Sequence, residues 1–136
     1  MPEFPEAHRD LLDVPVAILS TQGADGFPQV TATWFLFDRD DGALKLWLST
    51  ARQKTRNMQR NPQCTLLIPD PASPQRTLEV RGRAEVTDDS ARAFVDKLVP
   101  KYGEFVRNIG DEPPHHRVVV TLRPSKINVT DLRRPH

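Results

Sequence analysis

The chain has 136 residues, 38% of them apolar, and its 19 basic and 18 acidic side chains leave a formal net charge of +1. This length predicts one domain, residues 1–136, with a single core; the balanced charge argues against a nucleic-acid partner, and no apolar run is long enough to span a bilayer. The single cysteine, Cys64, excludes an internal disulfide, and with no secretory signal expected at the N-terminus it predicts a cytoplasmic protein.

The first part of the chain predicts a short helix followed by three strands. Residues 6–12 fit the helix, and residues 16–21 form a nearly continuous apolar run that is typical of a buried strand. Residues 29–37 alternate between apolar and polar side chains, as do residues 44–49, and an Asp-Gly pair before each of these segments supplies a tight turn. We therefore expect the three strands to pair in order as an antiparallel meander.

The rest of the chain predicts more strands, with helices between them. The expected elements are a helix at 51–60, a strand at 64–68, a Pro-rich loop at 69–74, a long strand at 76–86, helices at 88–102 and 104–108, and strands at 118–122 and 127–129. Thr87 or Asp88 is the expected cap of the longer helix, whose apolar residues recur at helical spacing. Six or seven antiparallel strands with short helices predict a mainly β fold, and closure into a small barrel would remove exposed edges.

The segment from Ser49 to Asn57 is the clearest candidate for a binding site. A strand ends at Ser49, and the helix that follows begins with Arg52 and Lys54 and contains no acidic residue. The N-terminus of a helix attracts anions, and the two cations can bind phosphate oxygens. Hydroxyl groups of Ser49, Thr50 and Thr55 can add donors. The residues alone predict either a phosphate-binding site or a solvated basic helix face.

These motifs, in this order, resemble the pyridoxamine 5'-phosphate oxidase-like split β-barrel family, and within it the deazaflavin-dependent branch. The resemblance rests on the segments ILST (18–21), DGFPQVT (25–31), WF (34–35), ST (49–50), RQKTRN (52–57), RNP (60–62) and LEVRGRA (78–84). It covers nearly the whole chain and implies a homodimeric split β-barrel with two cofactor sites at the subunit interface. Related branches bind flavin mononucleotide (FMN), deazaflavin or heme.

The resemblance also implies the residues that bind the cofactor. Arg52 and Lys54 would hold its phosphate with help from Thr55 and Asn57, and its ring would lie along the backbone of residues 29–33 and 49–50. The complete expected set is Gln29, Val30, Thr31, Ser49, Thr50, Arg52, Gln53, Lys54, Thr55 and Asn57. Residues 74–76 are a candidate contact with the partner subunit, although this chain lacks the aromatic residue that relatives often place near Gln75 or Thr77.

The implied function is that of a coenzyme F420 (deazaflavin)-dependent oxidoreductase. It would transfer hydride between F420 and an unsaturated small molecule such as an enone, a quinone or a tetrapyrrole. The alternatives are an FMN-dependent oxidase or reductase and a non-catalytic cofactor carrier on the same barrel. No catalytic side chain is identified, and a proton could come from solvent, since no acid stands beside the cationic segment in the sequence.

Other reactive residues favour structural roles. The four histidines, His8, His115, His116 and His136, lack the spacing of a metal site, so no metal is expected. Cys64 is expected in the core. We expect Trp34 and Trp47 in the core or at an interface rather than against a substrate. Tyr102 continues the apolar stripe of its helix and is not expected to donate a proton.

Overall fold

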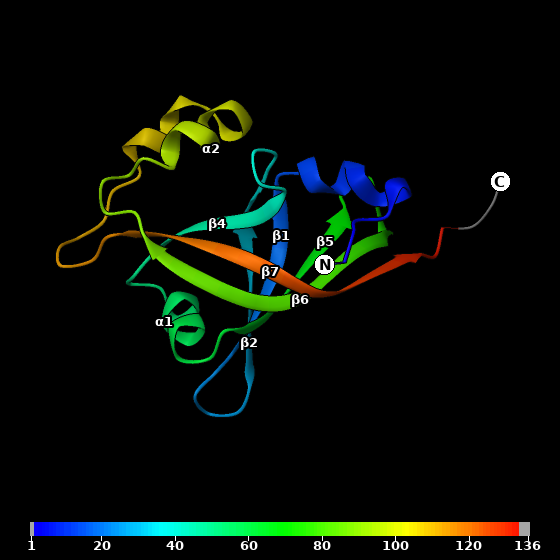
Figure 1. Ribbon diagram of the computed structural model, residues 1–136, viewed down its shortest axis with the longest axis horizontal. Coiled ribbons are helices and arrows are strands. Elements are labelled where there is room, and N and C mark those ends of the chain that lie inside the picture. Colours follow the sequence, from blue (N-terminus) through cyan, green and yellow to red (C-terminus); the bar gives the residue numbers. More distant parts are fainter. Residues whose placement is uncertain (1, 134–136) are drawn as a thin grey trace.

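Seven antiparallel strands form one sheet in the computed structural model of the protein, which describes residues 2–133 and so leaves His136 outside (Figure 1). The strands are β1 (Val16–Gln22), β2 (Pro28–Trp34), β3 (Leu36–Asp38), β4 (Ala43–Ser49), β5 (Gln63–Asp70), β6 (Ser73–Asp88) and β7 (Arg117–Asp131). The α-helices are α1 (Gln53–Arg60) and α2 (Val95–Tyr102), and the 3-10 helices are η1 (Glu6–Asp13) and η2 (Glu104–Asn108). The prediction of a mainly β fold with short helices is confirmed.

The sheet is a curled half-barrel with the order β2-β1-β5-β6-β7-β4-β3. In Figure 1 the long strands β6 and β7 cross the molecule side by side, with α1 below them and α2 above. The alternation predicted for the long strand is confirmed, since Leu78 and Val80 are fully buried while Arg81 and Arg83 are exposed. A second, smaller apolar cluster beneath α2 and η2 packs against Trp47 and Val119.

The expected three-strand meander is wrong, because the segment 29–37 changes its pairing partner in the middle. β2 pairs with β1, whereas β3 pairs with β4 at the opposite end of the sheet. The extended strand is interrupted between β2 and β3 at Phe35, whose side chain is buried. The hydroxyl of Tyr102 accepts a hydrogen bond from the Phe35 N–H at 3.0 Å, and Lys101 Nζ donates to the Phe35 carbonyl at 2.7 Å. The covalent chain, rather than a ladder of hydrogen bonds, therefore joins the two edges of the half-barrel.

The expected loop at 69–74 is also wrong, because β5 extends to Asp70 and β6 begins at Ser73, so that only a two-residue turn joins them. Arg76, just beyond this turn, is buried and pairs with Asp10 of η1 at 2.5 Å and with Asp70 at 3.1 Å. These ion pairs attach the N-terminal helix to the sheet. Pro74 and Gln75 remain exposed and available for the predicted contact with a partner.

Two further boundaries differ from prediction. The cap before α2 is Asp89 instead of Thr87 or Asp88, because β6 extends to Asp88. The Asp89 carboxylate accepts hydrogen bonds from the N–H groups of Ala93 at 3.0 Å and Phe94 at 3.2 Å. The two strands expected near the C-terminus are a single strand, β7, with an irregularity opposite Arg81 and Gly82. No helix within residues 2–133 is long and apolar enough to cross a membrane.

Candidate functional site

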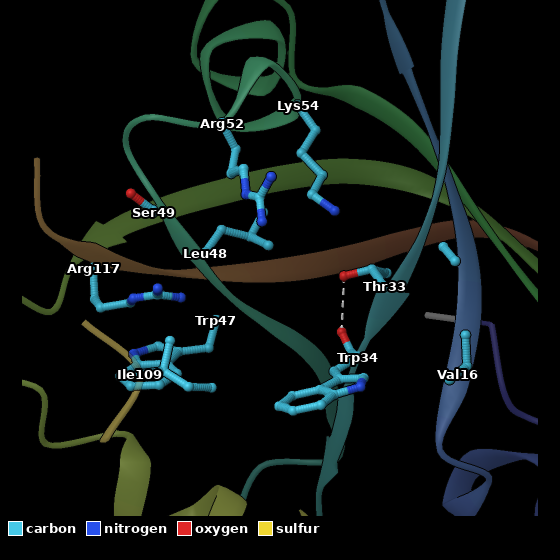
Figure 2. A pocket seen from close by; sticks show the side chains of 11 residues that line it. Val16, Thr33, Trp34, Trp47, Leu48, Ser49, Arg52, Lys54, Ile109 and Arg117 are labelled. Atoms are coloured by element: carbon cyan, nitrogen blue, oxygen red, sulfur yellow. Dashed lines mark hydrogen bonds between the residues drawn. The ribbon is translucent and has the colours of Figure 1, made fainter. Parts of the chain in front are cut away.

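A cavity of about 330 Å³ opens between β2, β4, the start of α1 and the start of β7 (Figure 2). The residues that line it are Val16, Ala32, Thr33, Trp34, Trp47, Leu48, Ser49, Arg52, Lys54, Ile109 and Arg117. Figure 2 shows Arg52 and Lys54 extending into it from α1, Arg117 entering from another wall, and the Trp34 ring at the opposite end. The cavity therefore joins a cationic end to an aromatic one.

The cationic end forms where β4 passes into α1. Ser49 ends β4 and its Oγ accepts the Ala51 N–H at 3.1 Å, while Arg52 keeps an extended backbone and is the N-cap of α1. Within residues 2–133, no side chain caps this helix and its first turn contains no acid. The free N–H groups and the helix dipole make this end of α1 favourable for an anion.

Arg52 and Lys54 form no ion pair with any carboxylate of the described chain. Lys54 is half-buried, and its Nζ donates to the hydroxyl of Thr31 on β2 at 3.3 Å. Burial, and then the neighbouring charge of Arg52, lower the pKa of Lys54 below its usual value. A bound phosphate would oppose both effects, so the pair is suited to hold one.

Binding of a phosphate-bearing ligand should therefore weaken at alkaline pH. The affinity for the ligand is expected to be highest below the lowered pKa of Lys54 and to fall as the pH rises through it, because a neutral amine no longer attracts the anion. The Arg52→Gln variant removes one cause of the shift and should move this fall to higher pH. Fluorescence titrations of FMN in buffers from neutral to alkaline pH measure both curves. A loss of affinity at the same pH in the two proteins would contradict the coupling between Arg52 and Lys54.

Aromatic side chains form the other end of the cavity. Trp34 stacks on Tyr102 with ring centroids 4.6 Å apart, meets Phe105 edge-on at 5.7 Å and keeps 38% of its surface exposed. The core alternative is wrong for Trp34, because β2 is an edge strand and the rings of Tyr102 and Phe105 cover only part of the indole. The interface alternative stays a prediction. Tyr102 has the expected structural role, and burial raises its pKa to about 12.

The ten predicted cofactor residues fall into three groups. Ser49, Arg52 and Lys54 line the cavity, and Thr31 holds Lys54. Gln29, Gln53 and Asn57 lie around a neighbouring hollow beside the β1–β2 hairpin. The buried Asn57 amide connects the other two, because its Nδ2 donates to Gln29 Oε1 at 3.1 Å and its Oδ1 accepts from Gln53 Nε2 at 2.8 Å. The remaining three line neither space, namely Val30, Thr50 and Thr55.

Two of the predicted hydroxyl groups bind other parts of the chain. Thr55 is fully buried and donates to the Ser49 carbonyl at 2.8 Å, which holds the end of β4 against α1. The Thr50 hydroxyl contacts His115 Nδ1 at 3.1 Å and accepts the His116 N–H at 3.2 Å, so it attaches the segment before β7. These two side chains support the cationic end without facing the cavity.

The cavity-lining residues outside the predicted cofactor segments are Val16, Trp34, Trp47, Leu48, Ile109 and Arg117, and among these Arg117 is the charged residue. Arg117 pairs with Ser49 in the register between β7 and β4, which brings it to the end of the strand that precedes α1. The only signal in the sequence is a basic residue just before the apolar run that begins at Val118. Nothing in that pattern indicates which strand β7 would pair with.

The donors and walls of the cavity fit a ligand that combines a phosphate with a flat ring. The two cations without carboxylate partners suit the phosphate. The indole rings of Trp34 and Trp47 and the side chain of Ile109 provide apolar surface for a ring. The volume is at the lower end of the range of small-molecule sites, and the cavity is open to solvent.

Known proteins resemble this chain over nearly its whole length. The sequence model of the family named Pyridoxamine 5'-phosphate oxidase matches residues 4–131. A solved structure named F420 reductase is 36% identical, with 92% of this chain and 98% of that one aligned and a TM-score of 0.75. A conserved hypothetical protein of Mycobacterium tuberculosis is 24% identical, with 98% and 91% aligned and a TM-score of 0.73. The heme storage protein HutZ of Vibrio cholerae is 17% identical, with 96% of both chains aligned and a TM-score of 0.73, and these last two matches establish the fold alone.

Proposed function

The chain belongs to the pyridoxamine 5'-phosphate oxidase family, and we propose that it is a coenzyme F420-dependent reductase that passes hydride to an unsaturated small molecule. The observation that carries this proposal is the pair Arg52 and Lys54, which line an aromatic-walled cavity with no carboxylate to neutralise them among the described residues. The identity of 36% to an F420 reductase favours deazaflavin over FMN. FMN remains the alternative, since it also combines a phosphate with a flat ring.

The side chains of this cavity bind and orient rather than react. A reduced deazaflavin, when bound, supplies the hydride. Arg52 and Lys54 would hold its phosphate, and the aromatic walls would restrict the ring and exclude water from it. The cavity-lining residues of the described chain include no carboxylic acid and no histidine, and the proton that follows the hydride could come from solvent.

A paired titration tests the choice of cofactor. We expect the purified protein to bind F420 more tightly than FMN, with reduced F420 oxidised faster when a quinone, an enone or biliverdin is added together with the protein. Tighter binding of FMN would transfer the proposal to the FMN-dependent class. Tight binding of F420 with no acceleration of its oxidation by any acceptor would identify a carrier instead of an enzyme.

We also propose that the protein is a homodimer whose partner covers the exposed face of β2. That face carries Val30, which is 58% exposed, and Trp34, next to Val16 of β1, which is 41% exposed. Apolar side chains gathered on an edge strand favour association. Light scattering at micromolar concentration is expected to give twice the chain mass of 15.4 kDa. A monomeric mass that persists with bound cofactor would contradict the dimer.

A further inference from the structure

Arg117 is a third cation of the cavity, and it comes from a different element than Arg52 and Lys54. It is the first residue of β7 and lines the cavity with a side chain that is only 12% exposed. The register of the sheet places it opposite Ser49, so it lies close to the start of the cationic segment but on another wall. Figure 2 shows its guanidinium reaching into the cavity beside Trp47, while Arg52 enters from α1.

The Arg117 side chain is held in a defined position. Its Nε donates to Asp111 Oδ2 at 3.0 Å, and its guanidinium carbon lies 4.8 Å from the centroid of the Trp47 ring. The indole is itself fixed, because its Nε1 donates to Asp89 Oδ2 at 2.8 Å. A guanidinium fixed by an ion pair and an aromatic ring loses little side-chain freedom when it binds a ligand.

The two Nη groups of Arg117 have no hydrogen-bond acceptor among residues 2–133, because only Nε meets Asp111. These donors belong to a largely buried cation in the cavity wall, where the attraction of an oppositely charged group is screened less than at the surface. A guanidinium whose Nη donors are free can donate charge-assisted hydrogen bonds to a negatively charged oxygen. Arg52 and Lys54 already provide for the phosphate, so Arg117 is available for another part of the same ligand.

We propose that Arg117 binds a negatively charged oxygen of the ring system of the cofactor, as an anion-binding residue separate from the phosphate site. This inference rests on the proposed function, since it requires a phosphate-bearing ring ligand in the cavity. A cation next to the ring stabilises the ionised form of the ring, so the residue would tune the acidity of the bound cofactor as well as its orientation.

Arg92 provides a matched control because it contacts the same indole ring and the same carboxylate as Arg117 but does not itself line the cavity. Its guanidinium carbon lies 5.0 Å from the centroid of the same Trp47 ring, and its Nη1 lies 3.5 Å from the same Asp111 carboxylate. Arg92 does not line the cavity. If Arg117 acts only by supporting Trp47 and Asp111, the Arg92→Gln and Arg117→Gln variants should behave alike toward ligands.

The test compares FMN with riboflavin, which differ only in the phosphate. If the protein does not bind FMN, it compares F420 with its deazariboflavin core, which lacks the phosphate and the chain attached to it. Arg117→Gln is expected to weaken both members of the pair by the same factor, about tenfold. Arg117→Lys, which keeps the charge without the fork, should weaken both by a smaller equal factor. Arg92→Gln should leave both affinities within about twofold of the original protein.

The spectrum of the bound ring gives a second measurement that does not depend on turnover. A pH titration of the bound chromophore, over the range in which its ring loses a proton, is expected to show a lower pKa for that ring group in the original protein than in Arg117→Gln. A loss confined to the phosphate-bearing ligand would place Arg117 at the phosphate and overturn the inference, as would equal losses in Arg92→Gln. If Arg117→Gln does not fold, unchanged binding of both ligands by Arg117→Lys would overturn it too. Failure of the original protein to bind any phosphate-bearing ring would instead contradict the proposed function.

Discussion

Replacing Arg52 and Lys54 together with alanine is expected to weaken cofactor binding at least tenfold. Each side chain can make a charge-assisted hydrogen bond to a phosphate oxygen, and such bonds contribute about 1.5–3 kcal/mol each. Neither cation has a carboxylate partner in the described chain, so their removal leaves no buried acid uncompensated and should change the free energy of unfolding little. The loss is therefore expected in binding rather than in folding, and a fluorescence titration of F420 or FMN measures it.

Arg56 supplies the control for this double variant. It lies on the same helix, and its guanidinium donates to the Ala51 carbonyl at 2.7 Å and to Gln53 Oε1 at 2.7 Å, outside the cavity. Arg56→Ala also removes a positive charge from α1 and should bind the cofactor as the original protein does. If both variants lose affinity equally, the effect comes from the general charge of the helix. If neither loses affinity, the phosphate does not bind at Arg52 and Lys54.

Replacing Gly82 with alanine is expected to destabilise the fold by about 3 kcal/mol or more, because the added methyl group collides with backbone. A Cβ atom at Gly82 would lie 2.2 Å from the carbonyl oxygen of Arg123 and 2.9 Å from its carbonyl carbon. Gly82 pairs with Pro124 and Arg81 pairs with Lys126, so Ser125 is an extra, unpaired residue that forms a β-bulge in β7 here. Backbone atoms in the two longest strands cannot rotate away as a flexible side chain would.

Gly110 is the matched position for this second variant. A Cβ atom there meets nothing within 4 Å, and the residue is exposed in the segment before β7. Gly110→Ala is expected to be neutral or slightly stabilising, since it reduces the freedom of the unfolded chain. Urea unfolding of the two variants measures the contrast. Equal unfolding free energies for Gly82→Ala and Gly110→Ala would show that the β6–β7 irregularity can adapt to a side chain.

The cationic pair of the site was predictable because its members are neighbours in the chain. Arg52 and Lys54 occupy the start of one helix that follows one strand, so local spacing alone brings them to the same end of α1. The resemblance to the family then assigned a phosphate to them. The alternation of β6 was predictable for the same reason, since a period of two places Leu78 and Val80 on one face.

The other half of the cavity depends on pairings between distant segments. Trp34 reaches it because the chain changes partner at Phe35 and leaves β2 as an edge strand, and an alternating pattern carries no information about which strand is the neighbour. Arg117 reaches it because β7 pairs with β4 in a register that sets it opposite Ser49.

The sequence by itself therefore determined the class of fold, the period of the long strand and the cationic start of α1. Only the tertiary structure decided that the half-barrel curls so that Trp34 and Arg117 share a cavity with Lys54. The physical reason is the range of the interactions. Helix starts and strand faces follow from neighbouring residues, whereas strand order and register follow from the burial of side chains contributed by the whole chain.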